Sequence, residues 1–480
     1  MNSKASRRDF LKVATAAGAV GYFSCCSPRT LFAQSPNEQP GIGFIGTGIR
    51  FHTYHGDQAL RHGPCPALAD VDALQLGRAY QVAIDNHREH GQPLVIAAHE
   101  DYRHVLDNKD VDVVCIATVD HWHTKIAIDA MRAGKDVYCE KPLSLTIQEG
   151  RQIIDVQKET GRVFQVGTQQ RTEYSKRFPQ AVAMVRDGRV GKLKQVAVAF
   201  GGSRISGPLP KVAPPKTLNW EMWLGQCPMA DYRQASDIVD QTGWGAGFPF
   251  GRAHRYYRWF YEYSGGKLTD WGAHHIDIAM WAMDKLTGDI GNVMIDPQFV
   301  EHPVPFKDGM PTKDDQFNCA TKFRVVCTFA DGQELIVEDH NKEFNFERGI
   351  VFKGTNRGPS GRFIVNRGRI VGKPVEDLRS NPLPDNAIAD LYEGDMPTSD
   401  QPDELGAHMN NFIDCVKTRK TPVSDVVSHH RMLAVCHAIN IALRLGRKLE
   451  FDPKSDSFVN DAQANTFVGR EQRKGYEITV

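Results

Sequence analysis

The chain has 480 residues, more than one ordinary domain holds, so about two to three domains are expected. Hydrophobic residues make up 41% of it and charged residues 24%, which is typical of a globular protein with enough apolar material for a core. Basic and acidic side chains both number 58, so the formal net charge is zero. This balance indicates neither nucleic acid nor an acidic membrane surface as a partner.

The first residues differ from the rest of the chain. Ser6-Arg7-Arg8-Asp9-Phe10-Leu11-Lys12 precedes a run of small apolar residues from Val13 to Tyr22. This pattern resembles a twin-arginine export signal, and the apolar run is too short to span a bilayer. We therefore expect a signal peptide over residues 1–33, cleaved after Leu31-Phe32-Ala33, and a linker over 34–40. The resemblance implies an exported, periplasmic protein with no stable membrane anchor.

The cysteines and histidines give no sign of a disulfide framework or a metal site. Of ten cysteines, Cys25 and Cys26 lie in the expected signal, and the remaining ones form no C-x-x-C pair. Several lie inside apolar strand-like runs, so buried free thiols are expected. His274 and His275 are adjacent rather than four residues apart, so we expect no zinc and no other metal.

A glycine-rich turn follows the first predicted strand. Gly41 to Ile45 reads as a buried strand that runs into Gly46-Thr47-Gly48-Ile49-Arg50-Phe51. Small residues at Gly46 and Gly48 allow a tight turn, and the N–H groups there and at Ile49 and Arg50 can approach a pyrophosphate at a helix start. Phe51 stands where a dinucleotide fingerprint has a third glycine or alanine. We therefore expect the helix to sit further from the sheet or to begin differently.

An acidic residue follows the next predicted strand. Pro66 to Ala69 ends at Asp70, 24 residues beyond Gly46. A carboxylate at this distance is placed to hydrogen-bond an adenosine ribose, and it would repel a 2′-phosphate, which favours NAD over NADP. Asp70 could also be the N-cap of a helix that begins near Asp72.

Strand and helix patterns alternate from residue 41 to residue 171. The strands predicted after Asp70 are continuous apolar runs, typical of strands buried on both faces of a parallel sheet. They are Val111–Ala117, Asp136–Cys139 and Val163–Val166. The alternation predicts an α/β fold whose N-terminal domain, residues 41–171, is a doubly wound Rossmann sheet.

Lys141 is the first candidate for a catalytic residue. Pro142 disfavours a helical backbone at Lys141, which keeps the lysine at the carboxyl end of a strand, where open parallel sheets bind their ligands. A lysine in that place can donate to a substrate hydroxyl or take its proton. By itself, however, a Lys-Pro pair after a strand is more often a solvated turn.

Five motifs occur in order in this half: Gly46-x-Gly48, Asp70, Asp120-His121-Trp122-His123, Glu140-Lys141-Pro142 and Gly167-Thr168-Gln169-Gln170-Arg171. Together they resemble the Gfo/Idh/MocA oxidoreductases, which include glucose-fructose oxidoreductase and inositol dehydrogenase. The resemblance covers nearly all of the chain after the expected signal. It implies that Thr118, His123, Glu140 and Lys141 lie along the cofactor, and that Arg171 lies where substrate contacts are expected.

From about Lys194 the pattern changes. A strand is predicted from Gln195 to Gly201, followed by a loop-rich passage that carries Arg255-Tyr256-Tyr257-Arg258-Trp259. Aromatic rings stack on apolar sugar faces and guanidinium groups bind hydroxyls or carboxylates, so Arg258 and Trp259 are candidate substrate contacts. Aromatic residues of this kind are also common in ordinary cores.

Asp270 and His274 form the second candidate chemical centre. If a helix begins near Asp270, the four-residue spacing puts both on one face, where the carboxylate can orient or charge the imidazole. Such a pair alone is more often structural. The family's D-x-x-x-H element falls on these residues, and the resemblance implies that they lie opposite Lys141 across the nicotinamide, with His274 also at the substrate.

The rest of the chain predicts a second domain. Strand patterns occur at Phe317–Phe329, Glu334–Glu338, Gly349–Lys353 and Phe363–Val365. They indicate an α+β substrate-binding domain over residues 172–407 with an open, mostly antiparallel sheet. Helical periodicity returns over 408–447, and 448–480 is expected to be a C-terminal tail. The family resemblance implies a homo-oligomer through the other face of this sheet.

Oxidation of a secondary alcohol needs a hydride acceptor and a base within reach of the hydroxyl. Lys141 and His274 are the candidates, and the sequence leaves open which takes the proton and which steadies the alkoxide. We expect an NAD-dependent oxidoreductase acting on a sugar, cyclitol or glycoside, with a bound, internally recycled cofactor because export would remove it from a soluble NADH pool. The alternatives are an NAD-requiring glycosidase or lyase acting through a transient 3-keto sugar, and a non-catalytic nucleotide- or sugar-binding protein.

Overall fold

The computed structural model of the protein describes residues 39–239 and 248–480. The expected signal peptide and nearly all of the expected linker lie outside the described residues, so neither prediction is tested. Within the two described ranges, none of the helices combines the length and the apolar character needed to cross a membrane.

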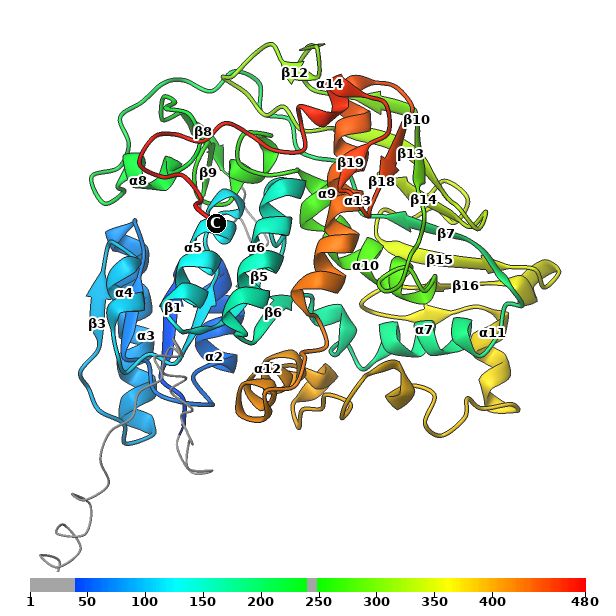
Figure 1. Ribbon diagram of the computed structural model, residues 1–480, viewed down its shortest axis with the longest axis horizontal. Coiled ribbons are helices and arrows are strands. Elements are labelled where there is room, and N and C mark those ends of the chain that lie inside the picture. The colour runs from blue at the N-terminus through cyan, green and yellow to red at the C-terminus, as the bar shows by residue number, and fades with distance from the viewer. Residues whose placement is uncertain (1–38, 240–247) are drawn as a thin grey trace, which may run out of the picture. The chain divides into compact units, whose positions relative to one another are not determined.

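The first sheet has six parallel strands in the order β3-β2-β1-β4-β5-β6, which confirms the predicted doubly wound fold (Figure 1). The strands are β1 (Ile42–Ile45), β2 (Ala67–Ala69), β3 (Ala97–His99), β4 (Val113–Ile116), β5 (Asp136–Glu140) and β6 (Phe164–Gly167). The order reverses between β1 and β4, the point at which open parallel sheets bind their ligands. β3 has no apolar run in the sequence because it is a short, partly exposed edge strand.

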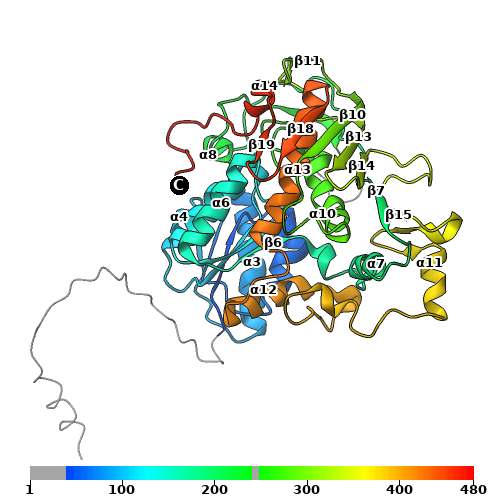
Figure 2. The ribbon, with the colours of Figure 1, turned by 45° about the vertical axis from the view of Figure 1, so that its right-hand side comes forward.

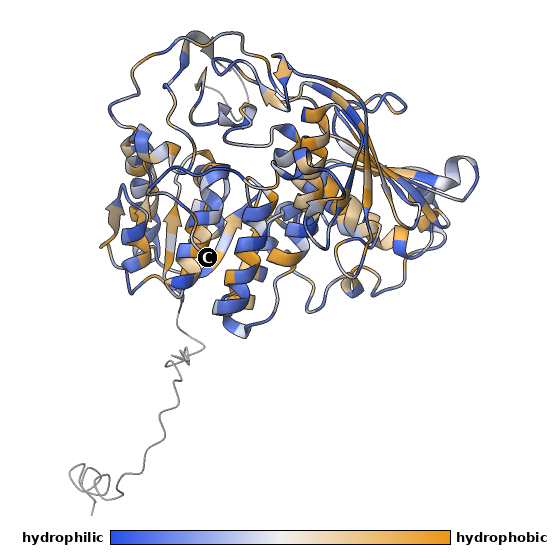
Figure 3. Ribbon diagram, turned by 45° about the horizontal axis from the view of Figure 1, so that its top comes forward, coloured by the Kyte–Doolittle hydropathy of each residue, from blue (hydrophilic) through white to orange (hydrophobic). Residues whose placement is uncertain are grey.

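Helices connect these strands: η1 (Phe51–His55), α2 (Gly56–Gln58), α3 (Ala73–Glu89), α4 (Arg103–Asp107), α5 (Asp120–Arg132) and α6 (Ile147–Thr160). Asp72, not Asp70, caps α3 by accepting a hydrogen bond from the Leu74 N–H. Thr146 caps α6 in the same way through the Glu149 N–H. Figure 3 shows hydrophobic and hydrophilic residues side by side along the helices, as expected of helices that pack one side on a sheet.

The second sheet has nine strands in the order β17-β16-β15-β7-β14-β13-β10-β18-β19. Only β7 and β14 pair in parallel, so the predicted open, mostly antiparallel sheet is confirmed. The strands are β7 (Leu193–Ala199), β10 (Val293–Glu301), β13 (Lys322–Phe329), β14 (Glu334–Glu338), β15 (Gly349–Gly354), β16 (Arg362–Val365), β17 (Ile370–Val371), β18 (Leu449–Asp452) and β19 (Ser457–Phe458).

Shorter elements complete the second half. The α-helices are α7 (Arg177–Arg186), α8 (Trp220–Leu224), α9 (Lys267–Asp270), α10 (Gly272–Ala282), α11 (Lys373–Glu376) and α14 (Ala462–Asn465). The 3-10 helices are η2 (Gln169–Arg171), η4 (Tyr256–Trp259), η5 (Gly358–Gly361), η6 (Asp377–Arg379), η7 (Ala389–Leu391) and η8 (Pro402–Glu404). Two small hairpins pair β8 (Gln234–Val239) with β9 (Pro249–Gly251) and β11 (Phe306–Lys307) with β12 (Met310–Pro311).

Two late helices return to the first half of the chain. α12 (Ala407–Thr418) packs into a hydrophobic cluster with Ile42 and Phe44 of β1. α13 (Val426–Leu445) lies between the two sheets in both views (Figures 1 and 2) and contacts α6, α10 and β10. A helix buried on nearly all sides carries apolar residues all round, and this is the pattern of α13.

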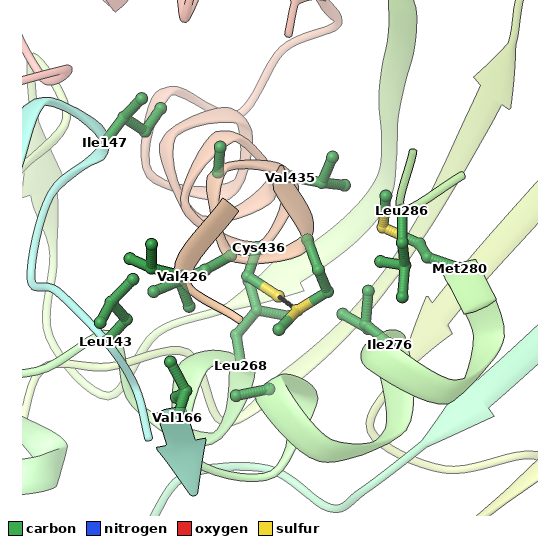
Figure 4. Packing of buried hydrophobic residues seen from close by; sticks show 14 of the residues in the cluster. Leu143, Ile147, Val166, Leu268, Ile276, Met280, Leu286, Val426, Val435 and Cys436 are labelled. Carbon is green, nitrogen blue, oxygen red and sulfur yellow. Dashed lines mark hydrogen bonds between the residues drawn. The ribbon is translucent and has the colours of Figure 1, made fainter. Parts of the chain in front are cut away.

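One core therefore extends from the first sheet through α13 to the second. Figure 4 shows α13 side chains between those of its neighbours: Val426, Val435 and Cys436 belong to α13, Leu143, Ile147 and Val166 to the first half, and Ile276 and Met280 to α10. Eight cysteines in the described ranges are free and buried, which confirms the prediction of buried thiols.

Candidate active site

A cavity of about 810 Å³ extends from the carboxyl ends of the parallel strands to the first helices of the second half. The predicted site residues that line it are Gly46, Gly48, Ile49, Arg50, Asp70, Thr118, His123, Glu140 and Lys141 from the first half, and Arg258, Trp259, Asp270 and His274 from the second. Arg171 is the one predicted site residue that does not line the cavity. Residues more than a hundred positions apart thus face one space.

The turn after β1 is shaped for close approach of a ligand. Gly46 has a φ of +83°, and a Cβ placed there would lie 2.6 Å from the Thr118 nitrogen, so no other residue fits. A Cβ on Gly48 would meet nothing within 4 Å, because this position faces the open cavity. Phe51 begins a π-helical turn, and its ring packs edge-on against that of Phe44, with the ring centroids 5.1 Å apart. The helix therefore begins differently from one with glycine or alanine at this position, as expected.

Asp70 shapes this turn from the neighbouring strand. Its carboxylate accepts a 2.7 Å hydrogen bond from the Thr47 N–H and a 2.8 Å bond from the Asp72 N–H. Burial raises the pKa of Asp70. Asp70 therefore anchors the loops after β1 and β2, and it also faces the cavity.

Glu140 binds partners other than Lys141. Its Oε1 accepts hydrogen bonds from Arg50 Nε at 2.6 Å and Gln169 Nε2 at 3.1 Å, and it lies 3.2 Å from His55 Nε2. Burial alone would raise the pKa of Glu140, but Arg50, His55 and Lys141 hold it well below its ordinary value. Glu140 therefore forms a hydrogen-bonded ion pair with Arg50.

The carboxyl end of β5 presents Lys141 to the cavity. Lys141 Nζ donates to Asp270 Oδ1 at 2.7 Å and to the Asp270 carbonyl oxygen at 2.9 Å. The Lys141–Pro142 peptide bond is cis. His123 lies behind this turn, with Nδ1 2.6 Å from the Pro142 carbonyl and Nε2 3.2 Å from the Thr118 carbonyl. Lys141 thus joins the two halves of the chain.

The expectation that Asp270 orients His274 is wrong. Asp270 ends α9 and His274 lies in α10, with Trp271 at the junction, so the two are not one turn apart on a single helix. The Asp270 carboxylate instead pairs with Lys141 and lies 3.8 Å from Arg258 Nε. Burial would raise the pKa of Asp270, but these cations and Lys267 hold it far below its ordinary value.

His274 faces the same cavity as a neutral imidazole. Its ring is buried, and Nδ1 has no hydrogen-bond partner among the described residues. Burial, Arg367 and Lys141 hold the pKa of His274 well below its ordinary value. A neutral imidazole keeps one ring nitrogen as a proton acceptor.

Arg171 is a structural residue and not a substrate contact, contrary to the expectation. It is 4% exposed and binds Asp277 through two hydrogen bonds, Nε–Oδ2 at 2.8 Å and Nη2–Oδ1 at 2.6 Å. Its Nη1 donates to the Val423 carbonyl at 2.6 Å. The pair ties η2 to α10, and neither of its residues lines the cavity.

Several cavity residues carry no local signal in the sequence. Arg348 and Arg367 come from connections between strands of the second sheet, and Lys267 lies on the short helix α9. Glu173 lines the cavity beyond the motif that ends at Arg171, and burial raises its pKa to about 7. These residues are single charges outside the recognised motifs, and only the fold brings them to one cavity.

The helix α8 and Leu218, two residues before it, line the cavity beside the loop that follows β2. The lining residues of α8 are Met222 and Trp223. The Asn219 N–H donates to the Val71 carbonyl at 2.9 Å, and the Ala73 N–H donates to the Thr217 carbonyl at 2.8 Å. The second half therefore closes over the loop that follows Asp70.

The residues present fit a dinucleotide. Gly46 and Gly48 leave room for a pyrophosphate at the start of η1, and Asp70 stands at the end of β2. Asp72 and Glu100 line the same end of the cavity, so a 2′-phosphate would meet several carboxylates. NAD therefore fits better than NADP.

Fold and cavity together define a dinucleotide-binding α/β protein in which both halves of the chain line one cavity. Two family models match: an oxidoreductase family's NAD-binding Rossmann fold over residues 41–168 and its C-terminal alpha/beta domain over residues 204–478. The chain belongs to the Gfo/Idh/MocA oxidoreductase family.

Curated relatives match over part of their length. A glycosyl hydrolase family 109 protein of Shewanella baltica (strain OS185) is 29% identical over 214 residues, which are 40% of this chain and 45% of that protein. An alpha-N-acetylgalactosaminidase of Shewanella oneidensis is 32% identical over 162 residues, 33% and 34% of the two chains. The match thus spans less than half the length of these relatives.

Solved structures share the fold over most of the chain. The WlbA dehydrogenase of Bordetella pertussis, in complex with NADH and UDP-GlcNAcA, has a TM-score of 0.55 at 16% identity, covering 86% of this chain and 97% of that chain. Levoglucosan dehydrogenase in complex with NADH and L-sorbose has a TM-score of 0.53 at 17% identity, covering 86% and 98%. At these identities the likeness shows the fold.

Proposed function

We propose that the protein is an NAD-dependent oxidoreductase that acts on a secondary alcohol of a sugar, cyclitol or glycoside. The observation that carries this proposal is that Lys141 and His274, from different halves of the chain, line one cavity whose far end is the glycine turn of a Rossmann sheet. An alcohol held between them has a proton donor and a proton acceptor at hand.

NAD, when bound, supplies the hydride acceptor for the alcohol carbon. The chain supplies groups for the alcohol oxygen. A lysine ammonium has three donors, and Lys141 uses two of them on Asp270, so the third is left for a substrate oxygen. This donor would stabilise the developing alkoxide, while the neutral His274 ring accepts the proton.

We also propose that the cofactor stays bound through the reaction and is recycled internally. The cover formed by Leu218, Met222 and Trp223 supports this, because it encloses the cavity at the adenosine end. Arg473 holds the residues after this cover, since its Nε donates to the Gly225 carbonyl at 2.8 Å. The export signal at residues 1–33, and hence a periplasmic location, remains part of this proposal.

A homo-oligomer through the outer face of the second sheet is likewise proposed. Ala197, Ile336 and Val351 form a small apolar cluster on that sheet, and Val326 and Ile364 lie partly buried against it. Light scattering of the purified protein measures the number of subunits, and a Val326→Glu variant should shift the mass toward the monomer. An unchanged mass in the variant would refute this interface.

The NAD-requiring glycosidase or lyase is the second candidate function. The names of the curated relatives, a glycosyl hydrolase family 109 protein and an alpha-N-acetylgalactosaminidase, favour it. Transient oxidation at C3 acidifies the neighbouring C–H, which permits elimination of a glycosidic leaving group. Release of nitrophenol from nitrophenyl glycosides, without net change in nicotinamide absorbance, would identify this activity.

The test of the first proposal compares the wild type with Lys141→Met. Each purified protein is mixed with a panel of sugars and cyclitols, and nicotinamide absorbance and nucleotide content are recorded. We expect the variant to keep its NAD and to transfer hydride at least ~10²-fold more slowly. Lys322→Met removes an exposed lysine outside the cavity and serves as the control. Unchanged transfer in Lys141→Met would refute the catalytic role.

A further inference from the structure

We propose that the substrate carries an anionic group, and that Lys267, Arg348 and Arg367 bind it beside Trp271. This inference rests on the proposed function, because it names the substrate class of the same cavity. The substrate is an acidic sugar. Its anionic group is a carboxylate, a phosphate or a sulfate, and each of these is a compact oxyanion.

The three cations surround one indole ring. Lys267 Nζ lies 5.7 Å from the centre of the Trp271 ring, Arg348 Cζ 4.7 Å and Arg367 Cζ 4.6 Å. All three side chains and Trp271 line the cavity. Cations gathered around an aromatic ring beside the cavity provide several donors for a charged substituent of a ligand.

No carboxylate of the described residues neutralises these cations through an ion pair. The guanidinium of Arg367 donates from Nε to the amide oxygen of Gln170 at 3.2 Å, which leaves its other N–H groups free of carboxylates. Asp270, the acidic residue nearest to Lys267 along the chain, is held by Lys141 at 2.7 Å. This wall therefore has an excess of positive charge that an anionic ligand would balance.

Mutual repulsion of the cations is visible in Lys267. Burial and the cations Arg348 and Lys141 lower the pKa of Lys267 to about 8, although Asp270 opposes the change. A ligand anion would relieve this repulsion. Cations that destabilise one another in the free protein are expected where their charges serve binding.

The position of the cluster points to substrate and not to the cofactor phosphates. Lys267 and Asp270 lie on the same short helix, and Asp270 binds Lys141. The cluster thus adjoins the proposed catalytic groups, whereas the residues that leave room for a pyrophosphate belong to the Gly46–Gly48 turn after β1. We therefore assign an anion bound at Trp271 to a substituent of the sugar substrate and not to the cofactor.

The test measures binding to the NAD-loaded protein by calorimetry. The ligands are D-glucuronate, its neutral methyl ester, D-glucose, glucose 6-phosphate and glucose 6-sulfate. We expect at least one anion to bind about tenfold or more tightly than the two neutral sugars. The anion that binds best distinguishes a carboxylate from a phosphate or sulfate ester. If no anion binds more tightly than the neutral sugars, the inference is wrong.

Two variants assign the effect to the cluster. Arg348→Gln and Arg367→Gln should each weaken binding of that anion about tenfold while changing the affinity for the neutral methyl ester less than about twofold. Arg357→Gln removes an exposed arginine of the same domain outside the cavity and is the matched control. A loss of bound NAD in the two variants, with anion affinity unchanged, would overturn the assignment.

Hydride transfer is recorded separately through nicotinamide absorbance. Selective anion binding without any transfer would refute the proposed oxidoreductase function and leave the anion site standing. Hydride transfer from neutral sugars, with no tighter binding of anions, would support the oxidoreductase function and refute the anion site. The two proposals can therefore fail independently.

Discussion

At the scale of single residues, Asp270 is the partner of Lys141. The sequence spacing points to His274, but the Asp270 carboxylate instead accepts from Lys141 Nζ at 2.7 Å, at the carboxyl end of β5. A charged hydrogen bond of this kind fixes the direction of a flexible lysine. The proposed donor is therefore positioned by a residue of the other half of the chain.

Substitution of Asp270 tests this role. We expect Asp270→Asn to slow hydride transfer about 100-fold, because Lys141 loses the charge that holds it. The bound NAD content should remain that of the wild type. Asp284→Asn, which removes an exposed partner of Arg186, is the matched control. Equal transfer rates for Asp270→Asn and the wild type would show that Lys141 needs no anchor.

Glu173 makes stability depend on pH. Burial raises the pKa of Glu173 to about 7 from an ordinary 4.5, so the folded state binds a proton more tightly than the unfolded state. The free energy of unfolding should therefore fall as the pH rises from 4.5 to 7, and the loss is complete above 7.

A Glu173→Gln variant removes this titration. Its side-chain oxygen can still accept from the Tyr54 hydroxyl and the Gly406 N–H, which bind Glu173 at 2.6 and 3.1 Å. We expect the variant to be more stable than the wild type at pH above 7, by on the order of 3 kcal/mol, and equal to it below 4.5. Denaturant unfolding across this range measures the difference. Parallel pH profiles of the two proteins would contradict it.

At the scale of elements, the Arg171–Asp277 pair joins η2 to α10. Both side chains are buried, at 4% and 0% exposure, and two hydrogen bonds connect them. Removing one partner leaves an unpaired buried charge, which is far more costly than removing both.

The difference in stability between removing one partner of the Arg171–Asp277 pair and removing both is measurable. We expect Arg171→Met to lower the free energy of unfolding by about 3–5 kcal/mol, and the double variant Arg171→Met/Asp277→Leu to lower it by less. Denaturant titration compares the three proteins. Sugar affinity of the folded fraction should be unchanged, since Arg171 lies outside the cavity. Weaker sugar binding at equal folded fraction would restore the substrate role that the sequence suggests.

The cover over the adenosine end is also an assembly of elements. α8 contributes Met222 and Trp223, and Arg473 near the chain's end binds its residues through the Glu221 carboxylate and the Gly225 carbonyl. The far end of the sequence thus stabilises the wall that encloses the cofactor.

Loss of that contact should release NAD. We expect Arg473→Gln to lower the ratio of NAD to protein after extensive dialysis, because the cover opens more often. Lys474→Gln, at an exposed neighbouring position, is the control. NAD content equal to the wild type in Arg473→Gln would mean that the cover does not depend on this arginine.

At the scale of the whole molecule, α13 explains why the two halves act together. It lies between the sheets and shares one hydrophobic core with both (Figure 1). The proposed donor Lys141 belongs to the first half and the proposed acceptor His274 to the second, and both line one cavity. A core common to both halves keeps them at a fixed separation.

Binding of NAD should therefore stabilise the molecule as one unit. A ligand that binds only the folded state raises the unfolding temperature with its concentration. We expect protein stripped of nucleotide to unfold at a lower temperature than NAD-loaded protein, in a single transition for both halves. Differential scanning calorimetry measures this, and two separate transitions would contradict the shared core.

The sequence by itself determined the repeating local features. Continuous apolar runs predict β1, β4, β5 and β6, because strands buried on both faces need apolar residues throughout. The Gly46 turn and the position of Asp70 are also predicted, because each directly follows a strand that the apolar pattern identifies. The strand β14 is predicted to the residue, while β10 and β18 have too little contrast with their surroundings to be recognised.

Only the tertiary structure decided how charged side chains pair. Arg171 and Lys267 are similar in sequence as cations beside recognised motifs, yet one is buried against Asp277 and the other lines the cavity with no carboxylate partner among the described residues. Such choices depend on which distant segment lies opposite, and a local pattern holds no information about that segment. The partners of Asp270 and Arg367 follow from the packing of the two halves for the same physical reason.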